Sequence, residues 1–396
     1  MGRGGRGRGK RAQQKGDAVE REALERAWQE RIEEAPELAA LVVARGAQRE
    51  PFHRWLGYRQ GFAPELVRRF LAEGKLPDGP VLDPFCGSGT VPTECARQGR
   101  FGIGGDVVSP LLFCAAARGS DPTDWTPPEE ATTFEACWAA AVDADDDATA
   151  RAAVLQAVSA AHDGEGRKLR DAATPRELVL TALTMMREDA MNEGERPESA
   201  AYVRSDARRL PYASASIAGV VTSPPYLSRY DYARVNDPLE KLYSGTGRRR
   251  GRRHQVRASR TAAPRQNDTI HPAVDEAAVR LANAGQPKLA AAVTGYAHDL
   301  DRALAELARV LRPGGPLWLV VAGADLKRVY IPADLVLAER CAEHGLRVER
   351  VEQARLLRGS SRLLGGLGGV APREVIIRCR RRLSPIAHDP HSGVRR

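Results

Sequence analysis

The sequence lacks the features that mark secreted, zinc-binding and membrane-spanning proteins. Its six cysteines form no Cys-x-x-Cys pair, and no group of Cys and His residues has the spacing of a zinc site. No run of eighteen apolar residues is present, and the Gly- and Arg-rich start has no apolar signal core. These absences predict a cytoplasmic protein with reduced, buried thiols and no membrane partner.

Acidic residues are fewer than basic ones, and the excess positive charge is clustered. The 396 residues carry 60 Lys and Arg against 51 Asp and Glu, which gives a net charge of +9. Residues 1–17 and the segment 244–268, with eight arginines, hold much of the excess and have no apolar periodicity. Such clustering favours a polyanionic partner, so nucleic acid is the expected class of ligand.

The pattern of apolar residues predicts an α/β fold with a helical insertion. Strands alternate with helices, which is typical of a doubly wound, mostly parallel Rossmann-like sheet. The last two strands, near 346–352 and 374–379, have no clear helix between them and predict an antiparallel edge strand. The expected order is a disordered tail at 1–17, N-terminal helices and the first Gly-rich turn at 18–110, an Ala-rich helical insertion at 111–198, a second α/β half at 199–380 with the basic loop 244–268, and a C-terminal tail at 381–396.

The most informative segment is Val-Leu-Asp-Pro-Phe-Cys-Gly-Ser-Gly-Thr at 81–90. A strand delivers Asp83 to its carboxyl end, and Gly87 and Gly89 let the backbone approach a ligand without a Cβ clash. Thr90 begins a helix whose free N–H groups face the same crevice. The turn differs from GxGxxG and has no P-loop lysine, so it predicts a nucleotide-like ligand rather than a bound phosphate.

A second strand ends in a carboxylate at Asp106, after Gly104 and Gly105. An acid in this position can accept hydrogen bonds from both hydroxyls of a ribose. Because one helix and one strand fit between Asp83 and Asp106, the two acids are expected at neighbouring strand ends. The pair predicts a nucleoside-binding crevice.

These segments resemble S-adenosylmethionine-dependent amino-methyltransferases that act on nucleic acids. DPFCGSGT resembles their motif I, and the resemblance implies S-adenosylmethionine as cofactor and Asp106 as its ribose acid. Asp206 resembles the motif III acid that accepts from the adenine amine. Residues 52–62 resemble motif X, which packs against the methionine end of the cofactor. The cofactor-binding residues so implied are Asp83, Pro84, Phe85, Gly87, Gly89, Thr90, Asp106, Asp206, Phe52 and Tyr58.

The segment Thr-Ser-Pro-Pro-Tyr at 222–226 follows an apolar strand and suits chemistry on an amine. An exocyclic base amine is a poor nucleophile, because its lone pair is delocalised into the ring. Two acceptors, the Ser223 hydroxyl and the Pro224 carbonyl, can hold its N–H groups and aim the lone pair. Pro224 and Pro225 stiffen the turn. Tyr226 offers an aromatic face to a base that has left the stack.

SPPY is similar to motif IV of DNA amino-methyltransferases, which implies catalytic roles for Ser223, Pro224, Pro225 and Tyr226. Ser at the first position favours N4 of cytosine in duplex DNA, with the base flipped out. Adenine N6 and an RNA target of the tRNA guanine-N2 type stay open, as does a non-catalytic nucleic-acid-binding module. Cytosine C5 chemistry is disfavoured, since the chain has no Pro-Cys dipeptide. The resemblance makes a cognate restriction endonuclease a candidate partner.

The motif order departs from many enzymes with SPPY, because motif I precedes motif IV here. The 111–198 insertion, which separates the two motifs, is a candidate target-recognition region. Further nucleic-acid contacts are expected close to motif IV and in the basic loop, which would place the protein on the nucleoid. The residues concerned are Arg229, Tyr230, Arg248, Arg249, Arg250, Arg252 and Arg253.

Overall fold

The computed structural model describes residues 19–45, 47–144, 147–163, 166–169, 173–192, 199–227, 231–245, 256–257, 269–357 and 371–383. The predicted tail 1–17, residues 384–396 of the C-terminal tail and most of the basic loop lie outside these ranges. So do Arg229, Tyr230 and the five arginines of 248–253.

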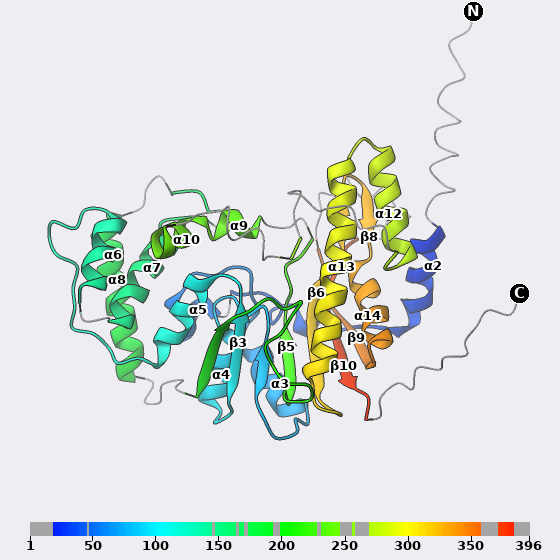
Figure 1. Ribbon diagram of the computed structural model, residues 1–396, viewed down its shortest axis with the longest axis horizontal. Helices are drawn as coiled ribbons and strands as arrows, with labels where there is room; N and C mark the ends of the chain where they lie inside the picture. Colours follow the sequence, from blue (N-terminus) through cyan, green and yellow to red (C-terminus); the bar gives the residue numbers. More distant parts are fainter. Residues whose placement is uncertain are drawn as a thin grey trace, which may run out of the picture.

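An eight-stranded sheet forms the centre of the protein (Figure 1). Its strands run in the order β1-β9-β10-β6-β5-β2-β3-β4. Their bounds are β1 Ile32–Glu34, β9 Leu346–Leu356, β10 Arg373–Arg381, β6 Pro316–Ala322, β5 Gly219–Thr222, β2 Val81–Asp83, β3 Gly102–Asp106 and β4 Ala200–Arg204. A separate pair is formed by β7 (Ala324–Leu326) and β8 (Val329–Ile331).

The predicted fold class is confirmed. Neighbouring strands are parallel except at β10, which runs antiparallel to both β6 and β9. The antiparallel pairing of the last two strands is therefore present, and β9 and β1 lie outside β10. Apolar residues at helical spacing predict one or two helices over 18–47, but Ile32–Glu34 form the edge strand β1. Three residues carry no detectable period, so only pairing with β9 reveals this strand.

Helices cover both faces of the sheet. The strands of a doubly wound sheet are buried on both sides, and β6 shows this through its alternating side chains. Leu317, Leu319 and Val321 pack in one cluster with α2 (Val19–Trp28), α12 (Pro272–Asn283), α13 (Pro287–Val310) and α14 (Ala333–Glu343). Trp318 and Val320 face the other cluster, with α3 (Pro64–Glu73) and α4 (Thr90–Arg97).

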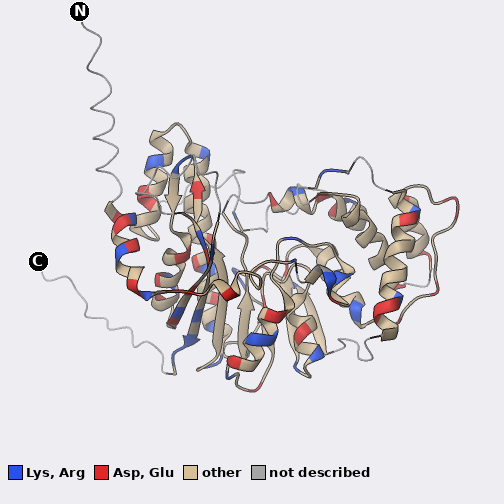
Figure 2. Cartoon of the chain, turned by 180° about the vertical axis from the view of Figure 1, so that it is seen from behind, with Lys and Arg blue, Asp and Glu red and all other residues tan. Residues whose placement is uncertain are grey.

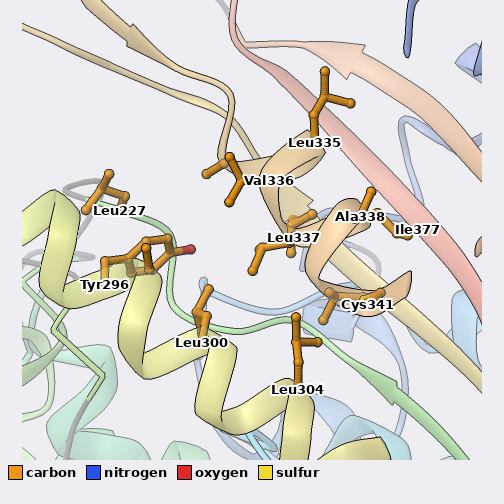
Figure 3. Packing of buried hydrophobic residues seen from close by; sticks show 14 of the residues in the cluster. Leu227, Tyr296, Leu300, Leu304, Leu335, Val336, Leu337, Ala338, Cys341 and Ile377 are labelled. Carbon is orange, nitrogen blue, oxygen red and sulfur yellow. The ribbon is translucent and has the colours of Figure 1, made fainter. Parts of the chain in front are cut away.

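The largest cluster shows why α13 lies where it does. Tyr296, Leu300 and Leu304 recur at helical spacing along α13 and face Leu337 and Cys341 of α14 (Figure 3). Apolar residues at helical spacing in the sequence predict a helix over 296–311. The observed helix runs from Pro287 to Val310, so it starts nine residues earlier and ends one residue earlier. The Pro313-Gly314-Gly315 turn then leads into β6, as the sequence predicts.

The Ala-rich insertion folds into a helical lobe, defined here as α6 (Phe134–Val142), α7 (Ala148–Ala160) and α8 (Pro175–Asn192) (Figure 1). It follows α5 (Ser109–Ala116), and the predicted breaks fall between these helices. Buried alanines such as Ala150, Ala153 and Ala157 let α7 pack closely on its neighbours. The lobe has a core of its own, beside the short helices α9 (Tyr232–Val235) and α10 (Asp237–Ser244).

One buried carboxylate ties this lobe to the segment that resembles motif X. Asp189 of α8 accepts hydrogen bonds from the Phe52 backbone N (2.8 Å) and from Trp55 Nε1 (2.9 Å). Arg54 adds an ion pair of 2.5 Å to the same side chain. The rings of Phe52 and Trp55, 5.6 Å apart, pack in the core of the lobe.

All six cysteines are buried and free. Among the described residues, no helix combines the length and hydropathy needed to cross a bilayer. Basic and acidic residues are interspersed along the described helices (Figure 2).

Candidate active site

A cavity with about 670 Å³ of empty space opens where four adjacent parallel strands end. Residues following β2, β3, β4 and β5 line it, together with residues from motif X, α9 and the basic loop. This is the edge of a doubly wound sheet at which ligands bind. The lining residues are Tyr58, Gln60, Pro84, Phe85, Asp106, Val107, Val108, Leu111, Ser205, Asp206, Ala207, Ser223, Pro225, Tyr232, Asn236 and Val256.

Asp83 joins motif I to motif IV. Its side chain is only 2% exposed, and Oδ1 accepts from Thr222 Oγ1 at 2.6 Å and from the Phe85 backbone N at 3.0 Å. Burial raises the pKa of this carboxyl to about 7, against the lowering effect of the Thr222 hydroxyl. Asp83 is not among the residues that line the cavity, so its observed contacts position the two turns.

Gly87 allows a close approach between motif I and motif X. Its φ of +50° is in the left-handed region, and a Cβ there would lie 2.6 Å from Cε1 of Tyr58. The Tyr58 ring therefore rests directly on the turn and forms part of the cavity wall. Burial raises the pKa of Tyr58 well above its usual value, so the phenol stays neutral.

Gly89 and Thr90 begin α4. Gly89 is the residue before the helix and has a φ of +82°; a Cβ there would lie 2.6 Å from the Ala115 Cβ. Thr90 is the first residue of α4 and is buried. Both shape the turn, and neither is among the lining residues.

Asp106 is held in a fixed orientation at the end of β3. Its Oδ2 accepts from the Gly87 backbone N at 2.9 Å, and its Oδ1 accepts from the Val108 backbone N at 3.0 Å. Burial raises the pKa of Asp106, and these two backbone donors oppose the shift. Each carboxylate oxygen has a second lone pair, so the group can still accept from a diol in the cavity.

Asp206 lines the cavity but is already engaged by an arginine. Arg208 donates from Nε to Oδ1 (2.9 Å) and from Nη2 to Oδ2 (2.7 Å). Arg208 also pairs with the buried Asp299, which binds Arg257 as well. Val256 and Arg257 belong to the basic loop, so this loop reaches the cavity wall beside Asp206. An acceptor role for Asp206 toward an adenine amine stays a prediction.

Motif IV contributes Ser223 and Pro225 to the same cavity as motif I. Pro224 lies buried between them. Tyr226 donates from Oη to Glu374 Oε1 at 2.7 Å, and Ser223 Oγ lies 3.4 Å from the Tyr226 oxygen. The Tyr226 backbone N donates to Tyr232 Oη at 3.1 Å. The Tyr226 hydroxyl is thus bonded to the sheet, and a stacking role for its ring stays a prediction.

Glu374 is a residue that the sequence interpretation missed. It is 2% exposed, and Arg355 donates from Nε to its Oε2 at 2.5 Å. Because β10 runs antiparallel, its first residues lie at the edge where the parallel strands end. In the sequence, Glu374 is one acidic residue at the start of an apolar strand, which indicates no role in the site. Only the placement of β10 in the sheet brings it to motif IV.

A second, larger cavity with about 1160 Å³ of empty space adjoins the first. The two share Tyr58, Gln60, Leu111 and Asn236 as lining residues. The helical insertion supplies part of the wall of the second cavity, and motif X and α10 supply the rest. Polar side chains in this wall include Arg54, Arg59, Gln156, Ser159, His162 and Asp163.

Phe52 does not line either cavity. Its ring is buried against the helical lobe, because the backbone at Phe52 (φ +62°) turns the side chain into that core. Of the two motif X residues expected at the cofactor, only Tyr58 therefore reaches the cavity. Gln60, Tyr232, Asn236 and Val256 are lining residues that the sequence interpretation had not named.

The first cavity suits a nucleoside that carries a charged, flexible tail. It combines a fixed ribose acceptor (Asp106), a turn whose glycine closes on an aromatic ring, and apolar walls from Phe85, Val108 and Leu111. S-adenosylmethionine has these parts, and the residues present fit it. Ser223 faces the same space, which places an acceptor for an amine beside the cofactor region.

Comparisons with known proteins agree with this geometry. A family model described as RMKL-like, methyltransferase domain, matches residues 69–288, more than half of the chain. The chain is 33% identical over 92 residues to the Type II methyltransferase M.BsoBI of Geobacillus stearothermophilus, covering 23% of this chain and 18% of that protein. It is 27% identical over 154 residues to the Type II methyltransferase M.AvaI of Nostoc sp., covering 33% and 31%.

The chain thus matches less than a third of the length of these two curated relatives. Among solved structures, a SAM-dependent methyltransferase from Methanosarcina mazei aligns with a TM-score of 0.35 at 11% identity. That alignment covers 80% of this chain and 98% of the other.

Proposed function

We propose that this chain, which belongs to the RMKL-like methyltransferase domain family, methylates the exocyclic amino group of a base in DNA, at N4 of cytosine. The chain has a methyltransferase domain, and its cofactor is S-adenosylmethionine. When bound, the cofactor supplies an electrophilic methyl group on a sulfonium. The base, the nucleic acid and the residue roles are the proposal.

The observation that carries the proposal is the position of Ser223. It lines the same cavity as Asp106, Pro84 and Phe85, so an amine held by the serine hydroxyl lies beside the cofactor region. Transfer would break the carbon–sulfur bond of the sulfonium as the amine nitrogen bonds to the methyl carbon, so that S-adenosylhomocysteine leaves and the surplus N–H proton passes to water. Ser223 Oγ, as an acceptor for that N–H, helps to localise the nitrogen lone pair toward the methyl group.

The choice of DNA rests on motif IV and on the walls of the site. SPPY resembles the signature of DNA amino-methyltransferases, and both curated relatives are named Type II methyltransferases. The second cavity adjoins the one that Ser223 lines and has room for a nucleotide, and its polar wall comes partly from the helical insertion. This supports target recognition by the insertion. Phosphate contacts by the arginines of 248–253 stay a prediction.

Transfer of tritiated methyl groups from the cofactor to duplex DNA and to tRNA tests the proposal. We expect transfer to DNA, and single-molecule sequencing of DNA from a host that expresses the enzyme would report the base and its sequence context. Methylation at adenine N6 would correct the base, and transfer to tRNA alone would replace DNA by RNA as the substrate.

The serine substitution separates the catalytic role from cofactor binding. Ser223→Ala removes the acceptor, so we expect transfer to be abolished while S-adenosylhomocysteine binds with unchanged affinity in calorimetry. Full activity in Ser223→Ala would contradict the role of this hydroxyl. Loss of both properties would mean that Ser223 supports the cofactor site instead.

A further inference from the structure

A buried carboxylate stands directly behind motif IV. Glu374 is opposite Arg355 of β9 and Ala322 of β6 in the sheet register. Thr222, the last residue of β5, pairs with Leu319 of β6, and Ala322 ends β6 three residues further on, in the direction in which the chain continues from β5 into Ser223. The sheet thus brings an acidic side chain to the edge that holds the active site, 148 residues from Tyr226 in the sequence.

Both oxygens of Glu374 are occupied by donors. Oε1 accepts from Tyr226 Oη at 2.7 Å and Oε2 accepts from Arg355 Nε at 2.5 Å, while the side chain is almost fully buried. A buried carboxylate is stable only with such partners. Arginine can only donate and a carboxylate can only accept, so the Tyr226 proton points to Glu374.

This fixes the direction of the next hydrogen bond. With its own proton directed at Glu374, the Tyr226 oxygen can act toward Ser223 only as an acceptor. Ser223 Oγ lies 3.4 Å away and is assigned as the donor. That distance is longer than a typical hydroxyl hydrogen bond of about 2.7–2.8 Å, and catalytic hydrogen bonds commonly tighten when substrate binds. Burial and the nearby Glu374 raise the pKa of Tyr226, which keeps the phenol protonated.

We propose that Glu374 is a positioning residue that, through Tyr226, turns the Ser223 hydroxyl proton away from the cavity. The serine lone pairs then face the substrate, as an acceptor for an amine N–H requires. The inference rests on the proposed amino-methyl transfer, because only an amine substrate needs Ser223 as an acceptor. Without Glu374, the serine proton is free to point into the cavity and oppose the substrate N–H.

Glu374→Gln gives the sharpest test, because it reverses the chain of donors. The amide oxygen must face Arg355, which only donates, so the amide NH₂ faces Tyr226. Tyr226 then donates to Ser223, and Ser223 donates into the cavity. We expect kcat to fall on the order of 10–100-fold, with KM changed by less than about 3-fold. Glu374→Asp keeps the direction of donation and should retain more activity than Glu374→Gln.

A matched control lies on the same two strands. Glu352 is also buried and pairs with Arg378 across β9 and β10, with Nε 2.5 Å from Oε2. Glu352→Gln disturbs a buried ion pair without touching motif IV, so kcat should stay within about 2-fold of wild type. Equal losses of kcat in Glu374→Gln and Glu352→Gln would reduce Glu374 to a structural residue and overturn the inference.

Tyr226→Phe removes the link between Glu374 and Ser223. In this background Glu374→Gln should cause no further loss of kcat, because the two side chains act as one unit. Additive losses would overturn the inference. The assay uses duplex DNA and tRNA in parallel, so that the comparison of variants is made with whichever substrate the wild-type enzyme methylates.

A readout without substrate separates this inference from the proposed function. In protein labelled with fluorotyrosine, the fluorine NMR signal of Tyr226 is identified by its loss in Tyr226→Phe. We expect it to shift in Glu374→Gln and to stay in place in Glu352→Gln. An unmoved signal would overturn the inference even in an active enzyme. A shift in a protein that methylates neither nucleic acid would leave the contact established and the proposed substrate wrong.

Discussion

The contact between Gly87 and Tyr58 makes a quantitative prediction for Gly87→Ala. The added Cβ would lie 2.6 Å from Tyr58 Cε1, whereas ordinary contacts begin at 3.4 Å, so the ring must move by about 0.8 Å (3.4 − 2.6). Overpacking of this kind costs about 1–3 kcal/mol. The left-handed backbone at φ +50° adds about 1–2 kcal/mol for any residue with a Cβ.

Gly99→Ala is the matched control. Gly99 has a φ of +69° and nothing within 4 Å of its ideal Cβ, so it carries the backbone cost alone. We expect thermal or denaturant unfolding to show a destabilisation of about 1–2 kcal/mol for Gly99→Ala and about 2–5 kcal/mol for Gly87→Ala. The difference between the two variants reports the contact with Tyr58.

Cofactor affinity should separate the two variants further. Tyr58 lines the cavity, so its displacement should weaken S-adenosylhomocysteine binding at least about 10-fold in Gly87→Ala, or about 1.4 kcal/mol in calorimetry. Gly99→Ala should bind as wild type does. In a Tyr58→Ala background, Gly87→Ala should cost less stability than in the wild-type protein, because the ring that it displaces is absent. Equal stability and equal affinity in the two glycine variants would refute the reasoning.

Three further predictions concern the rest of the site. The pKa of Asp83 is about 7 in the folded protein, above its ordinary value, so the folded state binds the proton more tightly than the unfolded state does. Raising the pH from 4 to 8 should therefore lower the free energy of unfolding by up to about 4 kcal/mol. Asp83→Asn can still accept from Thr222 and should remove this pH dependence in denaturant titrations. Ser159→Trp should fill the second cavity and raise the KM for DNA about 10-fold while S-adenosylhomocysteine affinity is unchanged; an unchanged KM would exclude this cavity from the substrate path. Deleting residues 248–260 should make DNA affinity less dependent on salt. The slope of log affinity against log salt concentration should become shallower by about 0.9 for each phosphate that the arginines of this loop neutralise. An unaltered slope in a binding titration would argue against phosphate binding there.

The sequence was sufficient for the features that depend on local chemistry. Glycines at 87 and 89 mark a turn because that backbone needs positive φ, and the structure has both residues there. Apolar runs and their spacing predicted the strands and the long helix before β6, since burial on both faces of a sheet leaves a continuous apolar pattern. Asp106 and Ser223 were placed at strand ends for the same reason.

Side-chain partners distant in the sequence depended on the tertiary structure. Thr222 and Asp83 are 139 residues apart, and no spacing rule links them. Phe52 and Tyr58 lie in one short motif, yet only Tyr58 reaches the cavity, because Asp189 of the insertion holds the motif against another core. Only the tertiary structure shows that residues of the insertion line the cavity next to the first one.

The sequence by itself thus determined the fold class, the two turns and the cofactor class, because these features depend on residues that are close together in the sequence. The tertiary structure decided which groups meet at those turns. Glu374 is the clearest case: the antiparallel direction of β10 places its first residues behind motif IV. The sequence predicted an antiparallel pair there, but the strand order that brings Glu374 behind motif IV follows from how the whole sheet assembles.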